Sequence, residues 1–183
     1  MRVLVIQSSP NRGGLTAACA AAAAEGAREA GAEVVDVRLN DLGIQRCDAC
    51  DDGWGTCRSE HRCQKLDGFA DVQAAVRDAD AYVFVTPVYW GEPSETAKAL
   101  LDRLRRCEAT HREESALGGK WALCVAAAGG SGRGTLTCLA SLERFLDHVG
   151  ARPFDLIGIT RYSREYKLEA IRRAAAAMVA WRG

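Results

Sequence analysis

Two adjacent aromatic side chains follow an apolar run in the middle of the chain, within residues 86–91 (Thr-Pro-Val-Tyr-Trp-Gly). The run at 81–85 has the composition of a buried strand, and a helical pattern begins near Ser94. A buried strand that ends in a rigid, proline-containing turn places the rings of Tyr89 and Trp90 at the open edge of a sheet. Such a ledge suits a planar ligand, although either ring alone could equally be a core or interface aromatic.

The first loop of the chain offers donors for an anion. An apolar run at 3–6 leads into residues 7–16 (Gln-Ser-Ser-Pro-Asn-Arg-Gly-Gly-Leu-Thr), and an alanine-rich helical pattern follows to about Ala30. Glycine lets backbone N–H groups close on an anion, Ser9 and Thr16 add hydroxyls, and a helix start favours negative charge. We expect a phosphate here; the alternative is an ordinary strand-to-helix turn with serine and threonine caps. The loop lacks the lysine of a P-loop, which argues against a nucleoside triphosphate.

A glycine-rich stretch follows another predicted strand, at residues 129–134 (Gly-Gly-Ser-Gly-Arg-Gly). Its backbone donors can approach the edge of a ligand ring without side-chain obstruction, although a plain flexible loop has the same composition. A phosphate loop, an aromatic ledge and a glycine loop that meet in one crevice together predict a flavin site.

Four cysteines are clustered between the second predicted strand and the next helix: Cys47, Cys50, Cys57 and Cys63. Four such thiolates can hold an iron–sulfur cluster or a structural zinc, and His61 could replace one of them at zinc. Free thiols or a redox pair are the third possibility. Acidic residues at 48, 51 and 52 add repulsion to an anionic site, which a metal's charge can offset. Spacing alone does not choose among these.

Apolar runs at 3–6, 34–37, 81–85, 121–127 and 154–159 alternate with helical patterns. This alternation predicts an α/β fold with a five-stranded parallel sheet covered by helices on both faces, a three-layer sandwich. A Gly-x-Gly-x-x-Gly motif does not follow the first strand, which disfavours the dinucleotide-binding order and favours the flavodoxin-like order 2-1-3-4-5. In that order the crevice opens between strands one and three, where the first two loops would meet.

Helical periodicity supports the sandwich, because three segments each carry one apolar stripe that can cover a sheet face. The stripes are Phe69, Val72, Val76 and Ala79; Ala97, Leu100, Leu104 and Cys107; and Leu139, Leu142, Leu146 and Val149. We expect one domain over residues 1–183, with a cysteine-rich insertion loop at about 42–67.

Bulk composition narrows the class of protein. The 183 residues carry 24 basic and 24 acidic side chains, a balance that favours neither nucleic acid nor an anionic membrane. The sequence has no run of about 18 apolar residues and no apolar N-terminal segment long enough for a signal peptide, so we expect a cytoplasmic protein. Its cysteines are then reduced, and the other four, Cys19, Cys107, Cys124 and Cys138, are expected to be small buried hydrophobes.

The three loops resemble those of the NAD(P)H-dependent FMN reductase family, including its iron–sulfur flavoprotein branch, over roughly residues 1–150. The first loop resembles the family's Gly-Ser-Pro-Arg and Asn-Thr pattern, with Leu15-Thr16 in place of Asn-Thr, and residues 87–90 match its Pro-Val-Tyr-Trp loop, continued by Lys98, Asp102 and Arg103. The resemblance implies that the FMN-binding residues are Ser9, Asn11, Arg12, Thr16, Pro87, Val88, Tyr89, Trp90, Gly91, Gly129, Gly130 and Gly132. In the iron–sulfur branch the second and third cysteines are closer together than Cys50 and Cys57 are here.

The resemblance implies an oxidoreductase in which FMN takes a hydride from NAD(P)H, with no catalytic side chain required. The electron acceptor would be a quinone, a nitro or azo compound, free flavin, or a redox protein reached through a four-iron four-sulfur cluster. A homodimer or homotetramer is expected by resemblance, with Trp54 and Trp90 as interface candidates. Two alternatives are a non-enzymatic FMN electron-transfer protein and a zinc-stapled domain of the same fold without flavin.

Overall fold

The computed structural model describes residues 1–181, and of Arg112 only the backbone. Its centre is a sheet of five parallel strands in the order β2-β1-β3-β5-β6. The strands are β1 (Arg2–Gln7), β2 (Glu33–Arg38), β3 (Ala81–Tyr89), β5 (Trp121–Ala128) and β6 (Arg152–Thr160). Counting only the parallel strands, this is the flavodoxin-like order 2-1-3-4-5, as the alternation of apolar runs and helices predicted.

A short antiparallel strand, β4 (Glu92–Pro93), pairs with the end of β3 and was not predicted. The strand β3 therefore continues through Pro87 to Tyr89, and the tight turn lies at Trp90 and Gly91, both with positive φ (54° and 84°). Two consecutive left-handed residues form the two-residue turn that suits the twist of a hairpin. The rigid turn expected at Pro87 is thus a β-hairpin three residues later.

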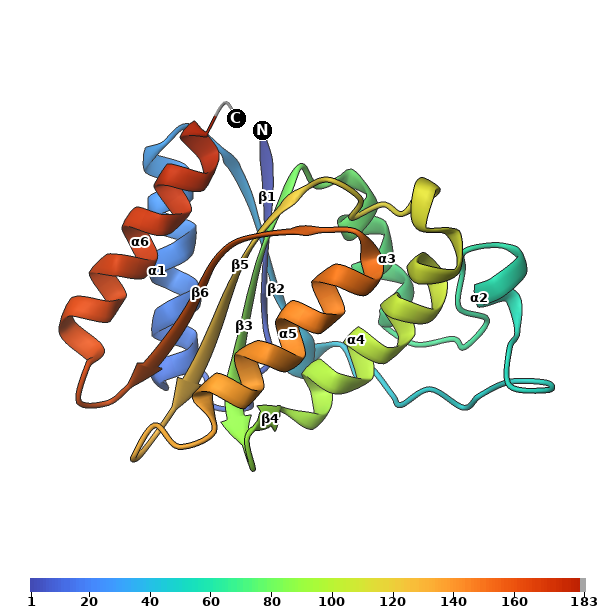
Figure 1. Ribbon diagram of the computed structural model, residues 1–183, viewed down its shortest axis with the longest axis horizontal. Coiled ribbons are helices and arrows are strands. Elements are labelled where there is room, and N and C mark those ends of the chain that lie inside the picture. The colour runs from blue at the N-terminus through green and yellow to red at the C-terminus, as the bar shows by residue number, and fades with distance from the viewer. Residues whose placement is uncertain (182–183) are drawn as a thin grey trace.

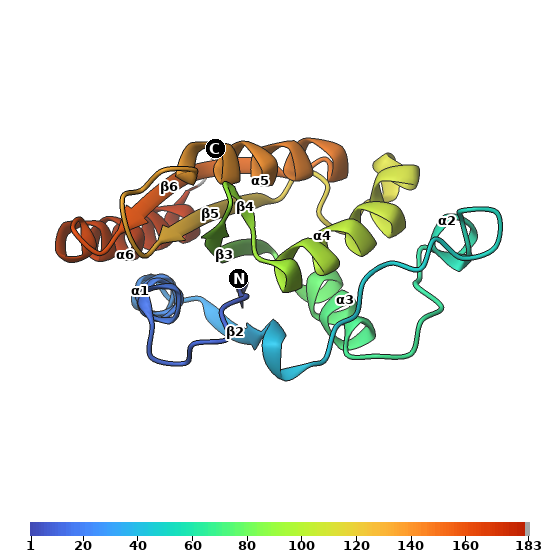
Figure 2. The same ribbon diagram turned by 90° about the horizontal axis from the view of Figure 1, so that it is seen from below.

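Helices cover both faces of the sheet, as Figures 1 and 2 show. One face carries α1 (Leu15–Glu29) and α6 (Arg164–Ala180), and the other carries α3 (Phe69–Asp78), α4 (Glu95–Glu108) and α5 (Thr135–Val149). The predicted apolar stripes of α3, α4 and α5 are all buried in the second of these layers. Gly26 allows α1 and α6 to touch, because a Cβ there would clash with the carbonyl of Arg172.

The strands are buried on both faces because successive side chains point to opposite layers. In β1, Val3 and Val5 pack under α1 and α6, whereas Leu4 and Ile6 pack under the three other helices. The same alternation continues along β3. This arrangement fixes the carboxyl ends of the strands, and hence the loops that follow them, at one edge of the sheet.

Most of the cysteine-rich loop lies away from the sheet. After η1 (Leu39–Asp41), its only regular element among the described residues is the single-turn helix α2 (Thr56–Ser59). Figures 1 and 2 place α2 beyond α4, at the opposite end of the molecule from α6. A second short helix, η2 (Ala109–Glu114), follows α4 and faces this loop, since His111 in η2 stacks against His61.

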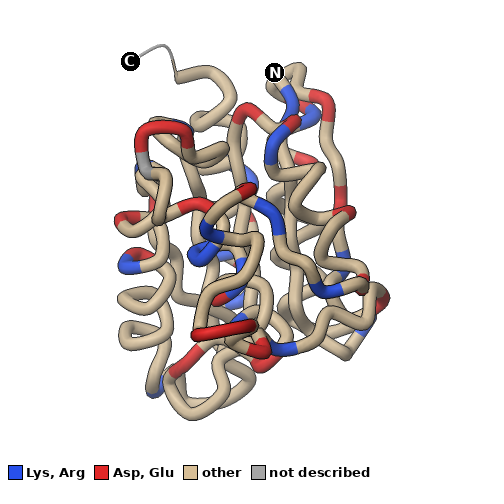
Figure 3. The backbone as a smooth tube through the Cα atoms, turned by 90° about the vertical axis from the view of Figure 1, so that its right-hand side faces the viewer, with Lys and Arg blue, Asp and Glu red and all other residues tan. Residues whose placement is uncertain are grey.

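None of the described helices has the length and apolarity that crossing a bilayer requires. Lysine and arginine positions are interspersed with acidic ones along the chain on the side that Figure 3 presents. This mixture agrees with the balanced formal charge of the sequence.

Candidate functional site

The first two loops are joined at their base by three buried hydroxyls. Ser8 Oγ donates to Thr86 Oγ1 at 3.0 Å, and Ser94 Oγ lies 2.9 Å from Ser8 Oγ and 3.0 Å from the Ser8 carbonyl. The backbone N–H of Ser94 donates to Thr86 Oγ1 at 3.0 Å. Ser8 follows β1, Thr86 ends the buried part of β3, and Ser94 caps α4. The contacts among them therefore fix the crevice between strands one and three.

The first loop is shaped by its own side chains around the start of α1. Ser9 Oγ accepts the N–H of Asn11 at 3.2 Å, and Asn11 Oδ1 accepts that of Gly13 at 3.1 Å. The N-cap residue of α1 is Gly14, which has no side chain that could cap the helix. Ser9 and Thr16 are buried beside this terminus. The first amides of a helix without a side-chain cap are available to an anion. The loop therefore fits a phosphate.

Arg12 does not point into this loop. Its guanidinium pairs with Asp41 at 2.7 Å, and 74% of its side chain is exposed. Asp41 lies in η1, after β2, and its second oxygen lies 3.3 Å from Nε of Arg38. In the described geometry, the groups of this loop that are available to a phosphate are therefore backbone amides and hydroxyls. Arg12 lies at the outer rim.

The second and third loops touch backbone to backbone. Gly134 has a φ of +82°, and a Cβ there would lie 2.6 Å from Cα of Gly91. Thr137 Oγ1, in the first turn of α5, lies 2.8 Å from the carbonyl oxygen of Gly91. Only glycine at 134 allows this approach, so the glycine loop and the hairpin turn form one continuous rim.

The ligand side of this rim is open. Trp90 is fully exposed and Tyr89 is 44% exposed. A Cβ built on Gly129 or Gly130 would meet no atom within 4 Å, whereas one on Gly132 would crowd Thr160 at 2.9 Å. Bare backbone next to open space and two exposed rings suit a flat ring system with polar edges.

All twelve residues expected to bind FMN thus lie in the three loops at the carboxyl edge of the parallel sheet. The sequence did not single out Asn40. Oriented to satisfy its neighbours, its amide nitrogen donates to the carbonyls of Ser8 (3.1 Å) and Ser9 (3.2 Å), and its oxygen accepts from Thr96. The available signal was its place just after the strand that neighbours β1.

The four clustered cysteines line one pocket, away from the sheet edge. Arg103 and Arg106 from α4 and Lys65 from the loop line it too. These cations lie beside the thiols and oppose the repulsion expected from the acidic residues of the loop. Lys65 also pairs with Asp48 at 2.6 Å, a hydrogen bond that lowers the pKa of that carboxyl.

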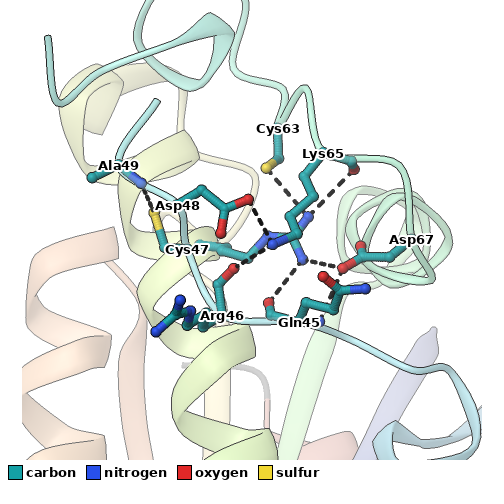
Figure 4. Close-up of polar contacts among 9 residues, drawn as sticks. Gln45, Arg46, Cys47, Asp48, Ala49, Cys63, Lys65 and Asp67 are labelled. Atoms are coloured by element: carbon teal, nitrogen blue, oxygen red, sulfur yellow. Dashed lines mark hydrogen bonds and ion pairs between the residues drawn. The ribbon is translucent and has the colours of Figure 1, made fainter. Parts of the chain in front are cut away.

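Arg103 anchors the cysteine-rich loop at both ends. Its guanidinium, 1% exposed, contacts Asp67 Oδ2 at 2.6 Å, the Gln45 carbonyl at 3.1 Å and Cys63 Sγ at 3.2 Å. Figure 4 shows these loop groups converging on one point, with the Lys65 carbonyl among them. Burial alone would raise the pKa of Asp67, but hydrogen bonds from Arg103 and from backbone N–H groups outweigh it and lower that pKa.

The described positions of the four thiols do not match a single zinc ion. Zinc at about 2.3 Å from four tetrahedral thiolates requires sulfurs only about 3.8 Å apart. In the part of the chain that the structure describes, three or more Cys, His, Asp or Glu ligand atoms come within 4.8 Å of one another at one place, His61, His111 and Glu114, which includes no cysteine. A four-iron cluster separates its thiolates more widely, and the buried, unpartnered Nη2 of Arg106 provides a donor beside the same pocket.

The remaining four cysteines are buried, as expected. Burial raises the pKa of Cys19, Cys107 and Cys138 to about 12, and it raises that of Cys124 as well. Thiols held protonated in this way are poor metal ligands. The chemistry of the cysteines is therefore confined to the pocket.

Comparison with known proteins confirms the family resemblance. Residues 1–156 match the family model described as NADPH-dependent FMN reductase. An iron–sulfur flavoprotein of Methanocaldococcus jannaschii is 28% identical over 130 residues, 71% of this chain and 65% of that protein. An iron–sulfur flavoprotein of Methanosarcina thermophila is 32% identical over 103 residues, 56% of this chain and 52% of that protein.

These matches span about half to two-thirds of the length of the curated relatives. Among solved structures, an NAD(P)H:quinone oxidoreductase from Methanothermobacter marburgensis has a TM-score of 0.75 at 18% identity, covering 97% of this chain and 96% of that one. That likeness supports the fold. Since the family model extends over most of the chain, the protein belongs to the NADPH-dependent FMN reductase family.

Proposed function

We propose that this protein is an FMN-dependent NAD(P)H oxidoreductase that passes electrons to a four-iron four-sulfur cluster in the cysteine pocket or to a small acceptor. The observation that carries the proposal is the convergence of the three loops at one sheet edge, held together through Ser8, Thr86, Ser94, Gly91 and Gly134. When bound, FMN accepts a hydride from a nicotinamide and releases electrons in pairs or singly.

The residues of this chain would divide the work of holding FMN. Amides at the start of α1, with Ser9 and Thr16, would bind the phosphate, where the helix dipole favours negative charge. The backbone at 87–91 would follow the ribityl chain, and the rings of Tyr89 and Trp90 would flank the flavin. The open backbone at Gly129 and Gly130 would contact its polar edge. No side chain needs to transfer a proton.

The cluster half of the proposal rests on the cationic surroundings of the pocket. Four thiolates around a four-iron cluster carry net negative charge, and the donor of Arg103 at Cys63 Sγ and the free donor of Arg106 would oppose it. A bound cluster of this type carries electrons one at a time. The iron–sulfur names of the relatives support this assignment, although the gap between Cys50 and Cys57 is longer than the family resemblance implies.

The flavin site is tested by titrating the full chain with FMN and then supplying NADPH or NADH without oxygen. We expect stoichiometric binding, bleaching of the flavin absorbance by one nicotinamide, and steady-state NAD(P)H oxidation with a quinone. Thr16→Val should weaken FMN binding about tenfold or more, because a hydrogen bond to a charged group contributes about 1.5–3 kcal/mol. Thr110→Val, outside the three loops, is the matched control.

The outcomes separate the candidate functions. Flavin that binds but is not reduced by either nicotinamide would favour a non-enzymatic electron carrier, and absence of flavin binding would overturn both. Iron and sulfide are counted after anaerobic purification, where we expect about four irons per chain. The Cys57→Ser variant should lose the iron and sulfide, and the Cys19→Ala variant should keep them. Zinc in place of iron would favour the alternative of a zinc-stapled domain.

Self-association is a further part of the proposal. The large exposed side chains Tyr89, Trp90 and Leu136 lie on the rim formed by the second and third loops. A homodimer or homotetramer would cover them beside the flavin. Sedimentation of the flavin-loaded protein should give more than one chain per particle, and Leu136→Ser should shift it towards the monomer; a monomer at all concentrations would contradict this part.

A further inference from the structure

A second group of ligand-type side chains lies outside the cysteine pocket. His61, in the cysteine-rich loop, and His111 and Glu114, in η2, each offer one ligand atom within 4.8 Å of the others. Nε2 of His61 lies 3.5 Å from Glu114 Oε2, and the imidazole centroids are 3.4 Å apart with ring planes tilted by 35°. The group joins two segments 50 residues apart in the sequence, so its formation depends on the tertiary structure.

The surroundings hold both imidazoles in place. His61 has a φ of +53°, a conformation that is costly for a side chain of this size, and its carbonyl accepts from Gln73 (2.6 Å) and Arg77 (2.7 Å) of α3. His111 departs from helical geometry inside η2, with φ −131° and ψ 50°. The backbone of His61 is thus held by α3, and His111 lies at a kink within η2.

The hydrogen bond of His111 leaves one ring nitrogen for a metal. Nε2 lies 2.5 Å from the carbonyl oxygen of Arg58, which can only accept, so Nε2 carries the proton and Nδ1 keeps its lone pair. Metal-binding histidines ordinarily donate their other N–H to a carbonyl or carboxylate in this way. A hollow of about 300 Å³, lined in part by His61 and Glu114, leaves room for water at the remaining coordination positions.

We propose that His61, His111 and Glu114 form a binding site for a divalent transition-metal ion of the zinc type. Two imidazoles and one carboxylate suit such an ion, whereas calcium and magnesium prefer all-oxygen sites. The bound ion would tie the cysteine-rich loop to the segment after α4. The site uses none of the loops assigned to FMN, so it stands whether or not flavin binds.

The chain contains three histidines, which allows a direct test. Zinc chloride is added to the ¹⁵N-labelled full chain, and the imidazole signals are followed by NMR. At one to two equivalents, the signals of His61 and His111 should move to a metal-bound form, and those of His148, on α5, should stay unchanged. Zinc taken up by the cysteine pocket is recognised because it should leave the signals of His111, which does not line that pocket, unshifted.

Variants sharpen the result. Glu114→Gln should weaken zinc binding at least tenfold as seen in the imidazole shifts, whereas Glu113→Gln, its exposed neighbour, should leave the affinity unchanged. His61→Ala should abolish the response of His111. The proposal is overturned if zinc is taken up with no imidazole shift, if all three imidazoles respond alike, or if the two glutamate variants behave identically; each result leaves the flavin assignment untouched.

Discussion

The sheet-edge site and the cysteine pocket are built in opposite ways. The sheet-edge site is formed by three short loops that follow β1, β3 and β5, and its position is inherited from the order of the strands. The cysteine pocket is formed by a long loop with one helical turn, and a cation from α4 holds it in place. The sheet-edge site therefore depends on many contacts that are each weak, whereas the cysteine pocket depends on a few contacts that are each strong.

This difference has an energetic consequence. Ser8, Thr86 and Ser94 share several neutral hydrogen bonds, each contributing about 1 kcal/mol. Arg103 instead supplies charge-assisted contacts to three parts of one loop from a fully buried position. Single substitutions should therefore damage the pocket more than the sheet edge.

The largest effect is expected for Arg103→Leu. Removing the guanidinium leaves the carboxylate of Asp67, whose side chain is 6% exposed, without its partner, and breaking a buried pair this way costs about 3–5 kcal/mol. Unfolding in urea at pH 7 measures the loss. Proteolysis within residues 42–67 should also become faster, because the loop loses its anchor.

Arg105→Leu is the matched control for this prediction. It lies two residues away on the same helix, is only half-buried, and does not line the cysteine pocket. Its stability change should stay within about 0.5 kcal/mol. Equal losses in the two variants would mean that Arg103 is no special anchor and that the contrast between the two sites is wrong.

A smaller loss, about 2–4 kcal/mol, is expected for Gly134→Ala. A side chain at a φ of +82° costs about 1–2 kcal/mol, and the collision of its Cβ with Gly91 adds the cost of overpacking. FMN affinity should fall as well, because the glycine loop must separate from the hairpin.

Gly119→Ala separates the energetic cost of the collision from the cost of a side chain at positive φ. Gly119 also has a positive φ, of +72°, but a Cβ there meets no atom within 4 Å. It should therefore lose only the conformational part and keep its FMN affinity. If the two alanine variants lost equal stability, the contact between the second and third loops would have no energetic role.

The parts of the molecule that follow from local pattern were predictable. Continuous apolar runs predicted the five parallel strands, and a period of 3.6 predicted the buried stripes of α3, α4 and α5, because burial dictates both. Strand order then placed Ser9, Tyr89 and Gly129 at one edge. The hairpin at Trp90 was missed, because a proline was taken to end β3 although it can lie in a strand where no partner needs its N–H.

The parts that depend on distant side chains were not predictable. Arg103 meets Asp67 across 36 positions of the sequence, and no spacing rule relates them. The pairing of Lys65 with Asp48 likewise changes the charge balance that the sequence indicated for the cysteines. The sequence indicated His61 only as a possible zinc ligand beside the cysteines; in the structure it is half-buried and stacks on His111.

Ser94→Ala should have a smaller effect, about 1–2 kcal/mol. Its hydroxyl caps α4 by accepting the N–H of Ala97 at 3.3 Å, and it holds Ser8 across the crevice. Loss of a serine cap costs about 1 kcal/mol, and loss of the hydrogen bond from Ser94 to Ser8 adds to it. Thr135→Ala is the comparison, because its hydroxyl at the start of α5 donates to Gly132 of the same loop and not to Ser8 or Thr86; thermal unfolding measures both. A Ser94→Ala loss no greater than that of a cap alone would mean that the crevice hydroxyls act independently.

The smallest effect concerns the pH dependence of stability. The pKa of Asp67 is lowered in the folded chain, so between about pH 3.9 and that lowered value the unfolded chain binds more protons than the folded one. The contribution of Asp67 is therefore fully present above about pH 4 and is lost as the pH falls through its folded pKa.

In Arg103→Leu, the main interaction that opposes the burial of Asp67 is gone, so its pKa rises and its share of the acid-side loss shrinks. Urea unfolding between pH 2.5 and 5 should show a shallower fall in the free energy of unfolding for Arg103→Leu than for the wild type, while Arg105→Leu runs parallel to the wild type. Parallel curves for all three proteins would show that the Asp67–Arg103 contact does not persist in solution, and the cysteine pocket would then lack the anchor that distinguishes it from the sheet edge.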